Sequence, residues 1–115
     1  MLAQKIFTAL GTERAASGLV AVTPAATVNI DPSMGVYSKW TIAQNCTINF
    51  TTGGYPGQIF TLIILNDGTI RTITWGTKMR VRSPTQAGTA NRTIVAQFIS
   101  DGVDFYSTLV NTGVV

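Results

Sequence analysis

The amino-acid sequence predicts an all-β fold, an antiparallel β-sandwich or jelly-roll-like domain of about 8–9 short strands. Short apolar runs alternate with turn residues along most of the chain, at the spacing of a sandwich or barrel. No long segment after residue 18 shows the 3.6-residue period of a helix. Only 11% of the residues are charged, and the abundant Thr, Gly and Asn residues suit strands and turns.

The chain length and composition predict one domain with a short N-terminal arm. At 115 residues the chain can bury a core without disulfides or metals. We expect residues 1–18 to form the arm and residues 19–115 to form the β-sandwich domain. Leu2, Ile6, Phe7 and Leu10 would share one face of a short helix, so the arm packs on the domain or docks elsewhere. A frayed terminus is the alternative.

Nine strands are expected in order along the domain. The run QIFTLIIL is nearly continuous in apolar residues, which predicts a central strand covered on both faces. Most of the other runs alternate apolar and polar residues and end at Gly, Pro, Asn or Asp. The expected strands are residues 19–23, 26–30, 36–42, 46–51, 58–65, 69–75, 78–82, 93–100 and 103–110.

Two Asp-Gly pairs, Asp67-Gly68 and Asp101-Gly102, each separate two β-prone runs. This arrangement predicts hairpins, because Gly and Asp tolerate the positive φ values of tight turns. Asp101 and Asp104 are also spaced like paired acids in a catalytic or metal site. We favour the turn interpretation, because side-chain bonds to nearby amides explain such aspartates and a calcium loop needs more oxygen ligands.

The residue types present narrow the possible chemistry. The chain has no histidine, which excludes Ser-His-Asp and Cys-His catalysis and histidine metal sites. The single cysteine, Cys46, excludes an intrachain disulfide, and we expect a small buried thiol there. We therefore expect no enzyme, no cofactor and no metal. No apolar run is long enough to span a bilayer and the start does not resemble a signal peptide, so we expect no membrane partner and assembly in a cytoplasm.

Cations recur on one side of residues 78–82. Lys78, Arg80 and Arg82 would lie on one strand face, and Arg71 and Arg92 could extend them into a stripe for an acidic partner. The alternative is a solvated face or an edge strand protected from aggregation by its charges. The net charge of +3 is mild and no aromatic cluster interleaves with the cations, so we expect no nucleic-acid partner.

Several strand and turn segments together carry a resemblance. In order, they are IDPS at 30–33, WTI at 40–42, CTINF at 46–50, FTLI at 60–63, NDGT at 66–69, RTITWGT at 71–77 and FISDG at 98–102. This succession resembles small β-rich modules of tailed-bacteriophage virion proteins, which include tail fibres, receptor-binding tips, head fibres and capsid decoration subunits. The resemblance implies a structural protein, commonly trimeric, without a cofactor.

We expect a capsid decoration (cement) subunit, because the chain is such a module with only a short arm. It would bind the outside of the assembled head as a homotrimer, contact the major capsid protein or another virion protein, and reside in the virion after assembly in the host cytoplasm. Self-association would also hide the apolar surplus of residues 58–65 and 103–110. The expected partner-binding residues are Leu2, Lys5, Ile6, Phe7, Lys78, Arg80 and Arg82.

The alternative function is a tail-fibre or receptor-binding module that recognises a host surface glycan or protein. It requires an exposed aromatic side chain in a shallow groove, for which Tyr37 and Tyr55 are the candidates.

Overall fold

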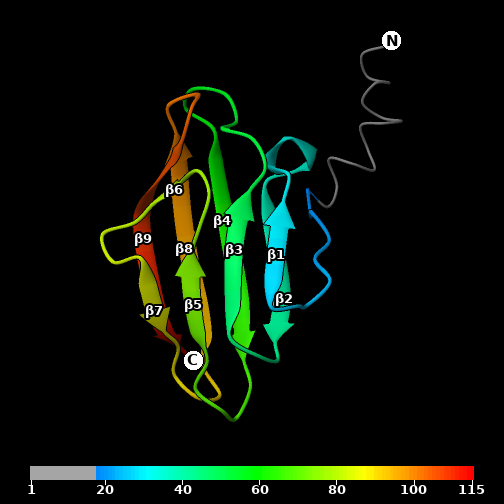
Figure 1. Cartoon of the computed structure of the whole chain (residues 1–115), viewed down its shortest axis with the longest axis vertical. Helices are drawn as coiled ribbons and strands as arrows, with labels where there is room; N and C mark the ends of the chain where they lie inside the picture. Colours follow the sequence, from blue (N-terminus) through cyan, green and yellow to red (C-terminus); the bar gives the residue numbers. More distant parts are fainter. Residues whose placement is uncertain (1–17) are drawn as a thin grey trace.

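The computed structural model describes residues 18–115, and this part of the chain is all-β without an α-helix (Figure 1). Its nine strands confirm the expected number within the described range. The strands are β1 (Thr27–Ile30), β2 (Tyr37–Ile42), β3 (Cys46–Phe50), β4 (Ile59–Asn66), β5 (Thr72–Trp75), β6 (Met79–Arg80), β7 (Thr85–Ala87), β8 (Thr93–Ser100) and β9 (Phe105–Val114), with a 3-10 turn η1 (Pro32–Met34).

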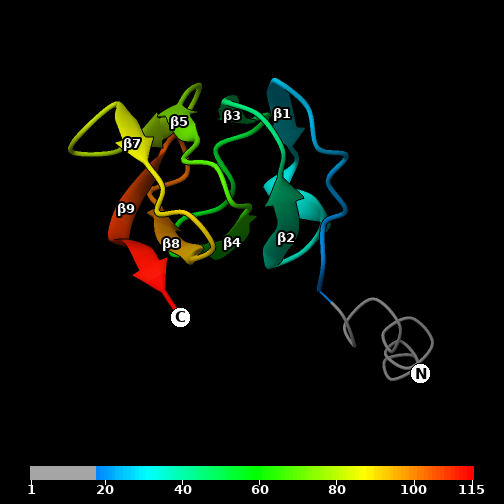
Figure 2. The same ribbon diagram turned by 90° about the horizontal axis from the view of Figure 1, so that it is seen from below.

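The strands form two facing sheets, which are seen nearly end-on in Figure 2. One sheet has the order β1-β3-β5-β7 and the other has the order β2-β4-β8-β9-β6. From β1 to β5 the chain alternates between the sheets, and each strand lies parallel to the strand two before it. This part of the chain therefore winds as a solenoid-like coil, and β8 and β9 then add antiparallel pairs.

The expectation of an antiparallel sandwich is wrong in its strand directions, because both sheets are mixed, and the jelly-roll-like detail is not confirmed. The turn at Asp67-Gly68 does not make a hairpin, because β4 pairs with β2 and β8 while β5 pairs with β3 and β7 in the other sheet. The Asp67 carboxylate accepts hydrogen bonds from the Thr69 backbone amide at 3.1 Å and from Arg71. These local bonds bend the chain but do not select the partner of the next strand.

The second Asp-Gly pair does make the expected hairpin, which joins the antiparallel strands β8 and β9. Asp101 Oδ1 accepts hydrogen bonds from the amides of Val103 at 2.8 Å and Asp104 at 2.9 Å. Gly102 adopts a φ of 96°, which side-chain-bearing residues rarely adopt. The turn interpretation of Asp101 is thereby confirmed.

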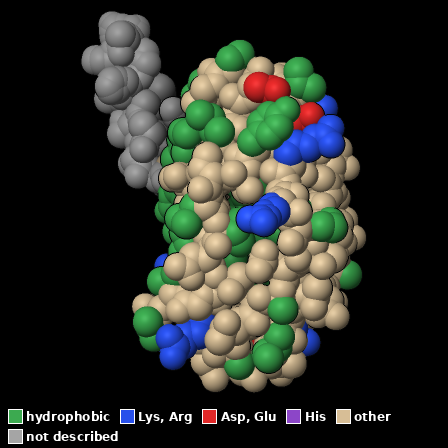
Figure 3. Space-filling view, turned by 90° about the vertical axis from the view of Figure 1, so that its left-hand side faces the viewer, with side chains coloured by type: hydrophobic (Ala, Val, Ile, Leu, Met, Phe, Trp, Pro, Cys, Tyr) green, Lys and Arg blue, Asp and Glu red, His purple; other side chains and the backbone are tan. Residues whose placement is uncertain are grey.

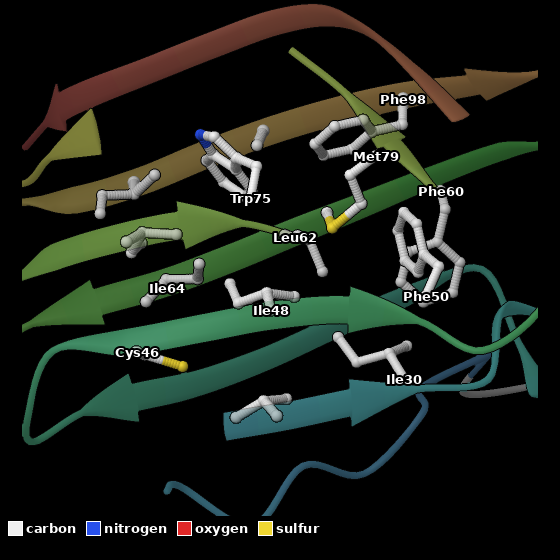
Figure 4. Close-up of a cluster of buried hydrophobic side chains, with 14 of the residues drawn as sticks. Ile30, Cys46, Ile48, Phe50, Phe60, Leu62, Ile64, Trp75, Met79 and Phe98 are labelled. Atoms are coloured by element: carbon white, nitrogen blue, oxygen red, sulfur yellow. The ribbon is translucent and has the colours of Figure 1, made fainter. Parts of the chain in front are cut away.

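The core fills the space between the two sheets (Figure 4). Phe50, the last residue of β3, makes edge contacts with Phe60 and Phe98 near one end of the core, at centroid distances of 5.4 and 5.7 Å. The centroid of the Phe50 ring is 4.5 Å from the centroid of the Phe105 ring. Each of these rings comes from a different strand, so the cluster ties the two sheets together.

One end of the coil is covered by irregular chain. Residues 19–23 do not form the expected strand, because Leu19 makes a single bridge to Tyr37 and the chain then leaves the sheet. Val20 and Val22 instead pack against the core. The chain before β1 runs along the outside of β1 and β2 (Figure 2). This cover protects the end of the coil from pairing with another chain.

Candidate interaction surface

The outer face of the five-stranded sheet exposes a row of aliphatic side chains. The expectation that residues 58–65 would be covered on both faces is wrong, because burial alternates along β4. Phe60, Leu62 and Ile64 are fully buried, whereas Ile59 is 42% exposed and Ile63 is half-buried on the outward side. The sheet therefore buries one face and leaves the other open.

Cross-strand pairing extends this row over three neighbouring strands. Ile59 on β4 lies opposite Ile99 on β8, and Ile99 lies opposite Tyr106 on β9. Ile63 lies opposite Val95 in the same way. We use the name outer face for the following set of outward residues on β2, β4, β8 and β9: Tyr37, Lys39, Ile59, Thr61, Ile63, Leu65, Val95, Gln97, Ile99, Tyr106 and Leu109.

Two hollows lie at the β2–β4 side of this face. One, of about 670 Å³, is an open groove on the outer face between Tyr37, Lys39 and Ile63. The other, of about 470 Å³, lies between η1 and the loop before β4 and includes Tyr55. Tyr55 lies on a loop, is 65% exposed and lines the second hollow, whereas Tyr37 lines the groove but lies on β2 and is half-buried, contrary to the expectation of an exposed loop residue.

A buried glutamine holds the second hollow together. Gln58 is only 4% exposed, and its Nε2 donates a hydrogen bond of 2.7 Å to the Pro32 carbonyl in η1. Its Oε1 accepts a hydrogen bond of 3.2 Å from the Tyr55 amide. The position of Tyr55 relative to η1 is therefore set by one buried side chain.

The cations expected to form a stripe are separated. β6 contains only Met79 and Arg80, and Lys78 has a φ of 64°, so residues 78–82 do not form the expected strand. Arg80 Nε donates a hydrogen bond of 3.1 Å to Asp104, whereas Arg82 is exposed beside β9. On the side of the molecule in Figure 3, the Lys and Arg side chains form small separate groups.

Arg71 and Arg92, the two arginines that could extend the stripe, lie at the opposite end of the strands from Arg80. Arg92 directly precedes β8, while Asp104, which holds Arg80, follows its end. The eight residues of β8 separate these positions by about 23 Å, at about 3.3 Å per residue. Arg71 is bound to Asp67 with an N–O distance of 2.9 Å.

The arm residues Leu2, Lys5, Ile6 and Phe7 lie outside the described residues.

The carboxylates of Asp31 and Asp67 accept hydrogen bonds from residues close to them in the sequence and thereby stabilise turns. Asp31 accepts hydrogen bonds from the side chain of Ser33 at 2.6 Å and from its amide at 3.0 Å, and these bonds lower the pKa of Asp31. Arg71, followed by the Thr69 amide, lowers the pKa of Asp67. Within residues 18–115, no group of three His, Cys, Asp or Glu side chains is placed to hold a metal ion.

Cys46 is buried at the start of β3, as expected, with 3% of its surface exposed. Burial raises the pKa of its thiol, which favours the protonated form. The nucleophilic thiolate is therefore disfavoured.

Asp101 is expected to contribute to acid sensitivity. The amides of Asp104 and Val103 lower the pKa of its carboxyl group. A lowered native pKa means that the contribution to stability is complete above the unfolded pKa, about 3.9, and is lost as the pH falls through the native pKa. Asp101→Asn should therefore be less stable than the parent near neutral pH, and the difference should shrink below about pH 4. Urea unfolding between about pH 6 and pH 2 measures this, and a difference that stays constant would contradict it.

Among the described residues, no helix has the length and apolar character needed to cross a membrane.

The fold and the surface together define an all-β, two-sheet coil with an open aliphatic face. Comparisons with protein-family models, curated proteins and solved structures find no match to this chain.

Proposed function

We propose that the chain is a bacteriophage virion structural protein, a capsid decoration (cement) subunit that binds the outside of the assembled head. The observation that carries the proposal is the outer face, where aliphatic side chains pair across strands on a two-sheet body. Contiguous exposed apolar surface of this kind is typical of protein–protein contact sites. The major capsid protein or another virion protein is the proposed partner.

The proposed mechanism is stabilisation by binding. Burial of apolar surface contributes about 25 cal/mol per Å², and a standard protein interface buries about 800 Å² on each partner. A subunit that binds the assembled shell but not its opened form stabilises the shell by about 2.7 kcal/mol at 100 times the dissociation constant. Such a mechanism uses shape and surface without catalytic groups or a cofactor.

We further propose that the subunit acts as a homotrimer. A single copy leaves Ile59, Ile99, Tyr106 and Leu109 between 38% and 49% exposed on the outer face. Association of copies would remove part of this surface from water. Sedimentation equilibrium measures the copy number, and a monomer at micromolar concentration would contradict the trimer.

The decoration proposal is tested with virion heads that lack this protein. Purified subunit should bind them and raise the temperature at which they release DNA. Ile99→Lys should weaken binding, because it puts a charge into the outer face, whereas Thr85→Lys on β7 of the other sheet should bind like the parent. Absence of binding by the parent, or equal binding by both variants, would contradict the proposal.

A second candidate is a tail-fibre or receptor-binding module that recognises a host surface glycan or protein. The hollow of about 470 Å³ with Tyr55 at 65% exposure favours it, because an exposed aromatic ring can stack on a sugar. Copy number per virion separates the two functions, since fibres are few and decoration subunits are many. Glycan-array binding that is lost in Tyr55→Ala would support the receptor-binding function.

A further inference from the structure

Exposed apolar side chains gather at one corner of the molecule. Met34 in η1 is 65% exposed, and Val36 before β2 is 57% exposed. Both line the η1 hollow together with Tyr55, and Val36 also lines the neighbouring groove with Ile59. We call Met34, Val36, Tyr55 and Ile59, the exposed apolar residues that line these two hollows, the corner patch. Exposed apolar side chains around two hollows form a suitable docking site for an apolar segment.

The described chain begins beside η1, which carries Met34 of this patch, and beside Val36, which directly precedes β2 (Figure 1). The Gly18 carbonyl accepts hydrogen bonds from the amides of Val36 at 2.7 Å and Tyr37 at 3.2 Å. Gly18 is so close to Val36 that a Cβ on it would lie 2.7 Å from Val36 Cγ2. Any segment before Gly18 therefore starts next to both hollows.

The sequence before Gly18 contains large apolar residues that match the apolar lining of the two hollows. Leu2, Ile6, Phe7 and Leu10 are large apolar residues, spaced so that they would share one side of a helix. Phe7 is eleven residues before Gly18, a stretch that can span at most about 36–40 Å. Every side chain of the corner patch is thus within reach of Phe7.

Covalent attachment makes even a weak contact effective. A short tether gives an effective concentration in the millimolar range, so a contact with a millimolar dissociation constant is substantially populated. A separate molecule would need comparable concentrations in solution to compete. The tether therefore favours the chain's own N-terminal segment as the occupant of the patch.

We propose that residues 2–10 dock on the corner patch of their own chain and place Ile6 and Phe7 against Met34, Val36 and Tyr55. The two hollows receive these apolar side chains, and the surface around Gly18 is covered before any virion partner binds. This inference concerns the isolated subunit and does not depend on the proposed function.

Methionine oxidation tests the docking in the full chain. Oxidation by hydrogen peroxide follows the exposure of the sulfur, and mass spectrometry resolves each site. The double variant Ile6→Ser, Phe7→Ser should oxidise at Met34 about threefold faster than the parent or more, whereas Gln4→Ser should match the parent. Met79, which is 6% exposed in the core, should not change in either variant and reports that the fold is intact. Equal Met34 rates in the parent and the double variant would overturn the proposal.

Disulfide trapping identifies which chain supplies the segment. Thr8→Cys combined with Thr52→Cys, which lines the η1 hollow, should form a disulfide within one chain under mild oxidation. Thr8→Cys with Thr85→Cys, on β7 of the opposite sheet edge, should not form this bond above background. If the thiols introduced at positions 8 and 52 joined mainly between two chains, the proposal would be overturned in favour of a neighbouring copy. Since both tests use free subunit, their outcome is separate from that of head binding.

Discussion

Replacing Phe50 by alanine is expected to lower the free energy of unfolding by about 3–5 kcal/mol, the usual range for a buried Phe→Ala change. Phe50 is fully buried and its ring contacts those of Phe60, Phe98 and Phe105. The truncation would leave a cavity between the sheets, and the three neighbouring rings, which are held by β4, β8 and β9 of the facing sheet, cannot close it without moving the sheets.

Urea unfolding followed by tryptophan fluorescence measures this loss. Val103→Ala is the control, because the Val103 side chain is 62% exposed in the β8–β9 turn. The hydrogen bond from Val103 to the Asp101 carboxylate comes from the backbone amide, so the substitution keeps it. Its effect should stay within about 0.5 kcal/mol. A loss below about 1 kcal/mol in Phe50→Ala would mean that the cluster does not join the sheets as described.

Replacing Gly54 by alanine should destabilise the fold through two separate effects. Gly54 has a φ of 68°, a left-handed conformation that costs a side-chain-bearing residue about 1–2 kcal/mol. A Cβ at Gly54 would also collide with the Gln58 side chain and lie 2.7 Å from Phe105 Cζ. The collision should add about 1–3 kcal/mol, because Phe105 belongs to the packed core.

Gly57→Ala separates these two effects. Gly57 lies in the same loop with a φ of 86°, but a Cβ there would meet no atom within 4 Å. Its loss of stability should therefore report the conformational cost alone, and Gly54→Ala should lose clearly more in the same urea titration. Equal losses in the two variants would contradict the packing of Gly54 against Phe105.

The positions of most strands could be predicted from local pattern. The local pattern predicts a strand at residues 93–100 and β8 has these bounds, while the predicted strands at 26–30, 36–42 and 46–51 differ from β1, β2 and β3 by one residue at an end. β7 was missed because Thr85, Gln86 and Ala87 form a short edge strand that contributes no apolar residue to the core. Strand prediction depends on side chains that are buried on one face, and an edge strand gives little of that signal.

Strand partners could not be predicted in the same way. The segments around Asp67 and Asp101 look alike in sequence, yet one crosses between the sheets and the other makes a hairpin. In both, the aspartate binds an amide two residues later. The bend is thus a local property, whereas the partner of the following strand depends on residues far away in the chain.

For the candidate surface, too, the sequence identifies the residues but does not predict how they are arranged in space. The run QIFTLIIL contains the aliphatic side chains of the outer face, but its near-continuous apolar pattern favoured a strand covered on both sides. The cations at 71, 78, 80, 82 and 92 are visible in the sequence, and the ion pairs of Arg71 and Arg80 and the length of β8 separate them in space.

Local chemistry alone thus accounts for the all-β class, the turns and the buried thiol of this protein, because strand alternation and side-chain-to-amide bonds act over a few residues. Tertiary structure decides the parallel, solenoid-like winding and the open outer face. Those features arise because strands such as β1 and β3 pair with each other although a strand of the other sheet lies between them in the sequence, and burial of side chains from both sheets in one shared core stabilises this arrangement.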